Sequence, residues 1–441
     1  MKNPALLIPA FCLLLPFTGC GSSGTNTTVT PITPSSIAIQ LSSATLTVSQ
    51  GSSGSATVVV SRTGTTGNVT LSLTGLPGGA TAAYQNPAAG NSGQITILTT
   101  AAALAGTYPL TVQATDGTYS ASSSLSLVIS AVLQIPTSYS WTSTGPIISA
   151  KSDATHNIIA VKDPSAVLYN GRWVIYASTV NSAGDYGMEY LNVAEDWSDA
   201  STATPYFLDY LPGTAPQVFY FAPQNKWYLI YQWTPQFSTN SDPTQPQNWT
   251  APTNFYASQP SSVSAWIDFW VICDSENCYL FFCGDNGNFY RASTPIGDFP
   301  NGFNTPVIVD SSSQFDMFEA DNVYSVEGTG QYLANIECLG PSGQRYFRAL
   351  WASSLGGTWT SLGNTDSFST PFLGEDNVTF NSGVSAWTTS FSSGGLLIDG
   401  NDQTDSVNPN NLQFLYQGAD PAANAPGYNA IPWQLGLATS N

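Results

Sequence analysis

Apolar and polar residues alternate along most of the chain, and they do so in two distinct ways. Between residues 36 and 131 the apolar runs are short and rich in Thr, Ser and Val, as in Ala56–Ser61, Val69–Leu73 and Tyr108–Gln113. Turn-forming clusters separate these runs, and no helical period interrupts them. From residue 139 onward the runs are fuller and more aromatic. The alternation therefore predicts an all-β chain with two folded units.

The first unit has the pattern of a β-sandwich. Its strands are short, and turns such as Gly64–Gly67 join them. The segment resembles bacterial immunoglobulin-like modules, and it contains no cysteine pair. Because it carries no candidate chemistry, we expect residues 36–131 to be a spacer or a weak carbohydrate-binding module. Residues 132–138 are the expected linker.

The second unit, residues 139–441, repeats a hairpin. A polar turn precedes a strand rich in aromatic and apolar side chains at intervals of about fifty residues. The strands concerned are Trp173–Tyr176, Trp227–Tyr231, Cys278–Phe282 and Gln331–Asn335. Roughly 300 residues of this pattern predict a β-propeller with about five four-stranded blades. A large jelly roll is the alternative, and the repeated pattern of turn and aromatic strand disfavours it.

The N-terminus predicts export. Lys2 precedes an apolar stretch, Ala5–Phe17, which is too short to span a bilayer and is typical of a signal peptide. Cys20 then stands where a bacterial lipoprotein carries its acylated cysteine, with an ordinary signal peptide as the alternative. Residues 1–19 are thus the expected signal, and residues 20–35, rich in Gly, Ser and Thr, a flexible tether. We expect a protein lipid-anchored at the bacterial cell surface or outer membrane.

Charge restricts the partners. Charged residues make up only 8% of the chain, and the formal net charge is −19. An acidic surface repels nucleic acid and anionic lipid, so neither is an expected partner, whereas a neutral polysaccharide meets no such repulsion. Contact with a membrane is expected only through the lipid anchor, and the protein is expected to be a monomer.

Two cysteines predict a disulfide. Cys273 and Cys278 flank the turn Asp-Ser-Glu-Asn between two apolar runs, so paired strands would bring them opposite each other. Two free buried thiols are the alternative.

The available residue types direct the search for chemistry toward carboxylates. His156 is the only histidine, no G-x-S-x-G elbow occurs, and neither a P-loop nor a dinucleotide fingerprint is present. A multi-histidine zinc site is therefore excluded, and a Ser-His-Asp triad has no support. Glycoside hydrolysis by carboxylates, or binding without catalysis, remains.

Three carboxylates interrupt or adjoin apolar strands, namely Asp163, Asp268 and Glu319. Burial of an ionisable group is unfavourable unless the group is paired or lies in a solvated cavity. Because the three lie on separate repeats, we expect them to meet around the central channel of the propeller. Alternation places Asp268 on the same face as Trp266 and Trp270, which predicts apolar surroundings and a perturbed pKa. Taken singly, each carboxylate is explained as well by a structural role.

Longer motifs in the second unit resemble glycoside hydrolase family 62, the α-L-arabinofuranosidases that act on arabinoxylan. The resemblance extends from about Trp141 to Leu437. The motifs that carry it are Trp141–Pro146, Ile148–Asp153, Ala160–Pro164, Ala215–Pro223, Trp266–Asp274, Asp285–Arg291, Phe318–Ala320, Arg345–Arg348 and Tyr416–Gly418. The resemblance implies a five-bladed propeller, a substrate of plant cell-wall polysaccharide, and hydrolysis with inversion.

The resemblance also implies roles for individual residues. Asp163 matches the general base, Glu319 the general acid, and Asp268 the carboxylate that tunes the acid and orients the substrate. An inverting pair leaves room for a water molecule, so the carboxyl groups of Asp163 and Glu319 are expected roughly 6.5–9.5 Å apart. Lys151 and Asp153 match residues that line the arabinose pocket.

Further positions match the surroundings of the site. Arg345 or Arg348 matches an arginine near the acid, and Arg345 is favoured because the two face opposite sides of a strand. Tyr428 and Asn429 match the segment that contacts the xylan chain. Trp233 is a candidate for stacking on a xylose ring, with an ordinary surface or core tryptophan as the alternative.

One segment departs from the family. The family usually carries a His-Gly-Glu run, linked to a central calcium, ahead of Asp-Gln-Thr. This chain has Ser392–Leu396 in that place, followed by Asp402–Thr404, so the histidine and the glutamate are missing. Gln403 remains as a candidate contact for a structural calcium through water. The expected chemistry itself requires no cofactor.

The missing histidine and glutamate leave other functions open. One alternative is that the second unit is a non-catalytic polysaccharide-binding propeller. Another is that it is a related propeller hydrolase that acts on arabinan or xylosides. A surface adhesin whose main function lies in the first unit is a further alternative.

Overall fold

The computed structural model describes residues 34–132, 134–423 and 425–441. The predicted signal peptide, the predicted lipidation site Cys20 and most of the predicted tether lie outside these residues. The chain divides between Ala131 and Val132 into two compact units, and the regular secondary structure of both is almost entirely β-strand. No helix in the described part of the chain is long and apolar enough to cross a membrane.

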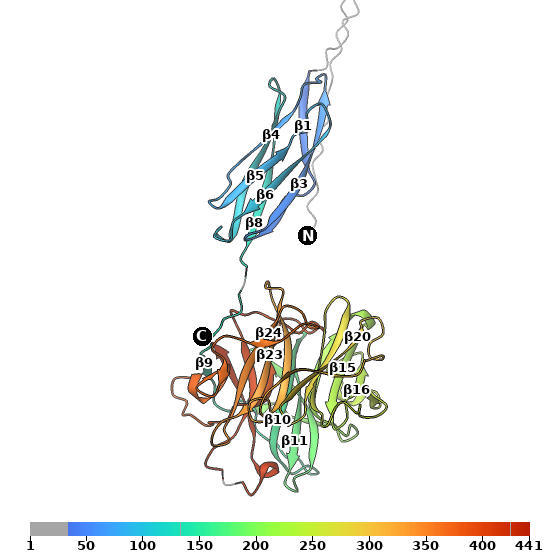
Figure 1. Ribbon diagram of the computed structural model, residues 1–441, viewed down its shortest axis with the longest axis vertical. Coiled ribbons are helices and arrows are strands. Elements are labelled where there is room, and N and C mark those ends of the chain that lie inside the picture. The colour runs from blue at the N-terminus through green and yellow to red at the C-terminus, as the bar shows by residue number, and fades with distance from the viewer. Residues whose placement is uncertain (1–33, 133, 424) are drawn as a thin grey trace, which may run out of the picture. The chain divides into compact units, whose positions relative to one another are not determined.

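The first unit consists of two four-stranded sheets (Figure 1), with strand orders β1-β3-β6-β5 and β2-β8-β7-β4. The strands are β1 (Ser36–Leu41), β2 (Thr45–Ser49), β3 (Ser53–Thr63), β4 (Thr70–Thr74), β5 (Ala80–Gln85), β6 (Ser92–Thr99), β7 (Gly106–Thr115) and β8 (Ser120–Ser130). Alternate side chains of β3, β6, β7 and β8 are buried, as expected for sheets with one solvated face. Val58, Ile95, Val112 and Leu127 lie in the core that these side chains form.

The second unit contains five sheets of four or five strands, together with one two-stranded ribbon. The first sheet contains β10 (Ile158–Tyr169), β11 (Arg172–Asn181), β12 (Tyr186–Ala194) and β13 (Tyr206–Phe207). The second contains β14 (Thr214–Phe221), β15 (Lys226–Gln232), β16 (Gln236–Asn240) and β17 (Thr253–Asn254). The third contains β18 (Ile267–Cys273), β19 (Asn277–Cys283), β20 (Asn288–Pro295) and β21 (Val307–Ser311). The fourth sheet contains β22 (Glu319–Val326), β23 (Gln331–Leu339), β24 (Arg345–Ala352), β25 (Thr360–Ser361) and β30 (Ser406–Val407).

The fifth sheet joins the two ends of the unit. It contains β9 (Trp141–Ser143), β28 (Val378–Phe380), β29 (Ser392–Leu396), β31 (Gln413–Gly418) and β32 (Gln434–Ser440), while β26 (Asp366–Ser367) and β27 (Thr370–Pro371) form the ribbon. Strand β9 pairs with β32, so that Trp141 lies opposite Ser440. Five short 3-10 helices complete the described elements: η1 (Ala200–Thr202), η2 (Ala222–Gln224), η3 (Pro246–Asn248), η4 (Glu375–Asn377) and η5 (Tyr428–Ala430).

The repeated aromatic runs of the sequence are the second strands of the first four sheets, β11, β15, β19 and β23. Figure 1 shows these sheets following one another in sequence order, from β10 and β11 in teal to β23 and β24 in orange. We call β10, β14, β18, β22 and β29 the inner strands. Each inner strand contacts the next, and β29 contacts β10, so the ring is closed.

Cys273 and Cys278 are joined by a disulfide at the end of the β18–β19 hairpin, where the two residues are directly paired. Cys283 and Cys338 are free and buried.

A β-bulge interrupts each of the first four inner strands at the same place. The pairing register shifts between Lys162 and Ser165, Thr214 and Gln217, Ile267 and Trp270, and Glu319 and Asn322. Inside each bulge one residue that is not glycine has a left-handed backbone, with φ of 49° at Asp163, 47° at Ala215, 53° at Asp268 and 51° at Ala320. Bulges of this kind bend the strand and redirect its side chains. The left-handed conformation is unfavourable for these residues, so the surrounding structure must hold it.

Side chains from the preceding sheet hold the bulges. The backbone N–H of each left-handed residue donates a hydrogen bond to such a side chain: Asp163 to Gln417 (2.8 Å), Ala215 to Ser178 (2.7 Å), Asp268 to Gln232 (2.7 Å) and Ala320 to Asp268 (3.0 Å). Leaving a buried donor without a partner costs about 1–3 kcal/mol. Contacts between neighbouring sheets therefore fix the local backbone of the inner strands.

Replacing Gln232 by leucine should remove the acceptor of the Asp268 amide. We expect Gln232→Leu to lower the free energy of unfolding by about 1–3 kcal/mol, because the amide then loses its side-chain acceptor in a half-buried position. Urea unfolding followed by tryptophan fluorescence measures this change.

Gln236→Leu is the matched control, because Gln236 lies on the same hairpin and bonds the side chain of Asn254 near the outer edge of the sheet. Its effect should stay within about 0.5 kcal/mol, as is usual for a surface substitution. Equal losses in the two variants would contradict the role given to Gln232.

Candidate active site

A pocket of about 140 Å³ brings the three predicted carboxylates together. We call it the carboxylate pocket. Its lining consists of Lys162, Asp163, Tyr186, Thr214, Gln232, Trp233, Ile267, Asp268, Asp285, Glu319, Ser393 and Tyr428. Three inner strands supply the carboxylates, since Asp163 lies in β10, Asp268 in β18 and Glu319 in β22.

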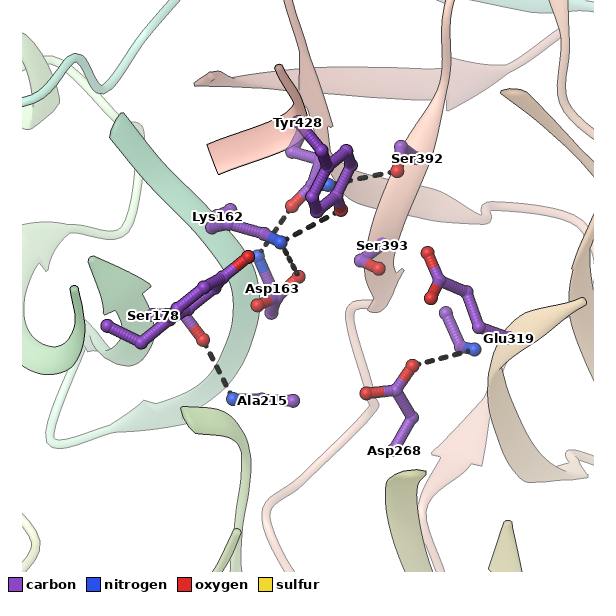
Figure 2. A network of polar contacts seen from close by, with 12 residues as sticks. Lys162, Asp163, Ser178, Ala215, Asp268, Glu319, Ser392, Ser393 and Tyr428 are labelled. Atoms are coloured by element: carbon purple, nitrogen blue, oxygen red, sulfur yellow. Dashed lines mark hydrogen bonds and ion pairs between the residues drawn. The ribbon is translucent and has the colours of Figure 1, made fainter. Parts of the chain in front are cut away.

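The bulges place these carboxylates in the pocket. Asp163 and Asp268 are themselves left-handed residues, and Glu319 directly precedes the left-handed Ala320. The carboxylate of Asp268 accepts the N–H of Ala320, so it is fixed relative to the backbone that carries Glu319 (Figure 2).

The expectation that Asp268 shares a face with Trp266 and Trp270 is corrected by the bulge. Trp266 packs against Phe269 at a ring-centroid distance of 5.9 Å, whereas Trp270 belongs to a different core cluster. Regular alternation fails here because the register shifts between Ile267 and Trp270.

The surroundings of Asp268 disfavour its charged form. Burial raises the pKa of Asp268 well above its usual range, and the nearby carboxylates of Glu319 and Asp163 raise it further. The N–H of Ala320 acts in the opposite direction without cancelling the shift. The pocket therefore disfavours a negative charge on Asp268.

Lys162 supplies a positive charge on the Asp163 side of the pocket. Its Nζ lies 3.7 Å from Oδ1 of Asp163 and donates a hydrogen bond of 2.9 Å to the hydroxyl of Tyr428 (Figure 2). Burial alone would lower the pKa of Lys162, but Asp163, Tyr428 and Tyr186 outweigh it and raise the pKa above its usual value. Lys162 therefore remains an ammonium group beside Asp163.

Arg345 supplies the second positive charge, on the Glu319 side. Its Nη1 donates to carboxylate oxygens of both Glu319 and Glu337, and its guanidinium lies 5.1 Å from the ring centroid of Tyr428. Arg348, the alternative in the sequence, donates instead to the backbone carbonyl of Asp316 at 3.0 Å. The structure thus places Arg345, and not Arg348, against Glu319.

Asp285 is a fourth carboxylate of the pocket. It comes from the turn between β19 and β20 and has a left-handed backbone, with φ of 51°. Partial burial and the neighbouring Glu319 raise the pKa of Asp285 to about 6, while Arg345 opposes the shift. Burial and the neighbouring carboxylate therefore favour the protonated form of Asp285.

Lys151 and Asp153 do not line the carboxylate pocket, which corrects the role that the resemblance implied for them. The Nζ of Lys151 donates to the backbone carbonyl of Ala203. Asp153 closes a turn with His156, whose Nδ1 lies 2.9 Å from Oδ1 of Asp153. Both residues lie in the segment before β10, where no strand fixes the direction of a side chain.

The aromatic residues lie at the mouth of the pocket. Trp233 is 56% exposed and meets Tyr186 edge to face, with ring centroids 5.6 Å apart. Tyr428 lines the pocket itself. Asn429 follows Tyr428 in the chain and accepts a hydrogen bond from the Tyr186 hydroxyl at 3.0 Å. Asn429 therefore fixes Tyr186 at the edge of the pocket and does not line the pocket itself. The exposed indole of Trp233, at the mouth of the pocket, is suited to stack on a sugar ring.

The residues present do not fit the central calcium that the resemblance implied. The side-chain oxygen of Gln403 accepts the N–H of Ala222 at 2.9 Å, and its carbonyl accepts the N–H of Cys273 at 2.7 Å. Gln403 is therefore a tie between the second and third sheets, which corrects its assignment to a metal. Among the described residues no three His, Cys, Asp or Glu side chains are grouped so that they could hold a metal.

Several residues of the pocket were not singled out from the sequence. Lys162 gave the same signal as the three carboxylates, a charge inside an apolar strand, and was detectable on that ground. Tyr186 and Gln232 gave no such signal, because strand ends of this kind are common across the chain, and Asp285 and Ser393 lie in named motifs without a role assigned to them. Only the closure of the ring brings them to one pocket.

The geometry suits acid–base chemistry on a neutral substrate. Asp163 has an ammonium group beside it, whereas Glu319 has a guanidinium and further carboxylates around it. Two carboxylates in such different surroundings are the arrangement expected for a general base and a general acid. The exposed aromatic rim would bind the apolar faces of sugars.

Comparison with known proteins agrees with this chemistry. A sequence model described as glycosyl hydrolase family 62 matches residues 140–439. The chain is 40% identical over 305 residues to alpha-L-arabinofuranosidase C of Cellvibrio japonicus (strain Ueda107), an alignment that covers 67% of this chain and 46% of that protein. The chain thus spans about half the length of this curated relative.

Solved structures give the same result. The catalytic domain of the GH62 alpha-L-arabinofuranosidase of Coprinopsis cinerea is similar with a TM-score of 0.66 and 44% identity, covering 69% of this chain and 98% of that one. An alpha-L-arabinofuranosidase of Podospora anserina, solved with cellotriose, has a TM-score of 0.66 and 42% identity, covering 70% and 98%. A GH62 hydrolase solved with xylotriose has a TM-score of 0.65 and 40% identity, covering 69% and 98%.

These matches coincide with the second unit and include all three inner-strand carboxylates. Through this unit, the chain belongs to glycosyl hydrolase family 62.

Proposed function

We propose that the protein is an inverting α-L-arabinofuranosidase that removes arabinofuranosyl side groups from arabinoxylan. The observation that carries this proposal is the meeting of Asp163, Asp268 and Glu319 in one pocket of a unit that belongs to this family. The related structures solved with xylotriose and cellotriose support a polysaccharide chain as the substrate.

Asp163 is the general base in this proposal. It removes a proton from a water molecule as that water attacks the anomeric carbon of the arabinose unit. Lys162 and the amide of Gln417 keep the base in place, through the ion pair at 3.7 Å and the hydrogen bond to its backbone N–H.

Glu319 is the general acid. It donates its proton to the glycosidic oxygen as the bond to the xylan chain breaks, and so the leaving group departs as an alcohol. Asp268 orients the substrate and, through its hydrogen bond to Ala320, the backbone next to the acid. Trp233, Tyr428 and Asn429 contact the xylan chain at the mouth of the pocket.

We also propose an architecture and a location. The five sheets of the second unit are the blades of a five-bladed β-propeller spanning residues 139–441, and residues 36–131 form an immunoglobulin-like sandwich that serves as a spacer. The protein is exported as a lipoprotein through Cys20, anchored at the cell surface or outer membrane, and acts as a monomer. The apolar stretch at the N-terminus and the tether after Cys20 support the export pathway.

Removing either catalytic carboxylate should abolish most of the activity. We expect Glu319→Gln and Asp163→Asn each to lower the release of arabinose from wheat arabinoxylan by about 10²–10⁴-fold, because each removes a proton-transfer step. Chromatographic measurement of released arabinose tests this. Glu276→Gln, at an exposed hairpin turn, is the control and should release arabinose at the wild-type rate. Wild-type rates in Glu319→Gln would refute the assignment of the acid.

The stereochemistry of the product should be inverted. Since water attacks the face opposite the leaving group, the first sugar released from an α-linked substrate should be β-L-arabinofuranose. Proton NMR during the first minutes of hydrolysis reports the anomer before it equilibrates. Retention would exclude the proposed mechanism, and release of sugar from debranched arabinan or xylo-oligosaccharides instead of arabinoxylan would favour the related hydrolase. Binding to xylan with no product would favour the non-catalytic alternative.

The first unit should be dispensable for the chemistry. The chain divides at Ala131, and the carboxylate pocket lies wholly within the second unit. We expect deletion of residues 36–131 to leave kcat/KM on a soluble aryl arabinofuranoside unchanged. A loss of activity without loss of thermal stability would mean that the first unit contributes to catalysis.

A further inference from the structure

A fully buried carboxylate lies directly behind the pocket. Glu337 is in β23, opposite Glu319 in the pairing of β22 with β23, and its side chain is 0% exposed. Burial of an ionised carboxylate is strongly unfavourable unless several groups bind it. Burial raises the pKa of Glu337, whereas the guanidinium of Arg345 and the hydroxyl of Ser392 act in the opposite direction and stabilise its ionised form. Such a residue requires an explanation beyond packing.

Glu337 and Glu319 share one arginine. The Nη1 of Arg345 donates to Oε1 of both carboxylates, so the guanidinium lies between them. The groups that face Glu319 from other elements are Arg345 of β24, Glu337 of β23, Asp268 of β18, Asp285 of the β19–β20 turn, Tyr428 of η5 and Tyr186 of β12, and Asp163 and Lys162 of β10 line the same pocket. Arg345 is the cation that contacts Glu319, whereas Lys162 lies beside Asp163.

A lone arginine beside a general acid would work against its function. A positive charge within hydrogen-bonding distance favours the ionised form of a carboxyl group, whereas a proton donor must be protonated when the substrate binds. The charge of Glu337 offsets that of Arg345, and the ion pair that they form is then neutral as a unit.

We propose that Glu337 is a positioning residue that holds Arg345 and neutralises it, so that Glu319 can carry the proton it gives to the leaving group. This inference rests on the proposed function. It assigns to Glu337 an action on the acid through Arg345, without contact to the substrate.

Two serines hold Glu337 in place. Ser392 Oγ donates to Oε1 of Glu337 at 2.9 Å, while the backbone N–H of Ser393 donates to Oε2 at 2.6 Å, and Oγ of Ser393 lies 3.3 Å from the same oxygen. These serines lie side by side in strand β29. This strand therefore supplies hydroxyl groups at the place where Glu337 needs donors.

The same network reaches the general base. The side-chain amide of Gln417 donates to Oγ of Ser392 at 2.9 Å, and its oxygen accepts the backbone N–H of Asp163 at 2.8 Å. Ser392, Gln417 and Glu337 are all fully buried. A continuous line of hydrogen bonds thus joins Glu319, Arg345, Glu337, Ser392, Gln417 and Asp163, and Glu337 lies near its middle.

Glu337→Gln tests the inference through the pH dependence of catalysis. Without the negative charge of Glu337, Arg345 favours the ionised form of the acid, so the basic limb of the kcat/KM profile should move to lower pH by about one unit. Ser393→Ala removes one hydroxyl group near Glu337 and should shift the limb in the same direction by less. This second variant keeps the test decisive if Glu337→Gln does not fold.

Two substrates separate an effect on the acid from a general disturbance. A nitrophenolate leaves with little help from an acid, whereas the sugar hydroxyl of arabinoxylan needs protonation. Near neutral pH, Glu337→Gln should therefore lose about tenfold more kcat/KM on arabinoxylan than on p-nitrophenyl α-L-arabinofuranoside. Equal losses on the two substrates would indicate a merely structural role and overturn the inference.

Glu189→Gln is the matched control. Glu189 in β12 is also buried, at 2% exposure, and burial raises its pKa to about 8, but it interacts with Lys151 and not with Arg345. Its variant should keep the wild-type pH limb whatever its effect on thermal stability. An unshifted limb in Glu337→Gln, or equal shifts in the two variants, would overturn the inference while the proposed function stands. If the wild type itself released no arabinose from either substrate, the proposed function would fail and the inference with it.

Discussion

Four inner strands carry a residue in a left-handed backbone conformation, and the structure around the pocket depends on holding that conformation. A residue other than glycine does not adopt it readily, and the N–H that it exposes must find an acceptor. The acceptors come from the neighbouring sheet: Gln417, Ser178, Gln232 and Asp268. Each bulge is thus stable only when its neighbour is in place, and the ring of sheets and the direction of the carboxylates are formed together.

The charged groups in the pocket also depend on one another. Asp163, Asp268, Asp285 and Glu319 line one pocket, where Lys162 lies beside Asp163 and Arg345 contacts Glu319 from behind the lining. Two surroundings result, one with an ammonium group beside Asp163 and one with an arginine shared between Glu319 and Glu337. This asymmetry separates the properties of a base from those of an acid, although both are ordinary carboxyl groups. A neutral sugar can enter such a site without the free-energy cost of moving a charge out of water.

The run from Ser392 to Leu396 in strand β29 connects the surroundings of Glu319 with those of Asp163. It contains neither histidine nor glutamate, and Gln403 accepts hydrogen bonds from backbone groups of the second and third sheets. Its two serines bind Glu337, and Ser392 is connected through Gln417 to the backbone of Asp163.

The sequence by itself determined the strand pattern, the division into two units and the three carboxylates that meet in one pocket. Charges within apolar strands are rare enough to mark Asp163, Asp268 and Glu319, because burying them has a large and general cost. Lys151 and Asp153 were misplaced because they precede the first inner strand, where no alternation fixes the direction of a side chain. Alternation around Asp268 failed because the bulge adds a residue to one strand and not to its partner. The register of β22 against β23, the turn that carries Asp285, and the closure of β9 on β32 were decided only by the tertiary structure. The reason is physical: the state of a charged group depends on its neighbours in space, and here those neighbours come from strands far apart in the chain.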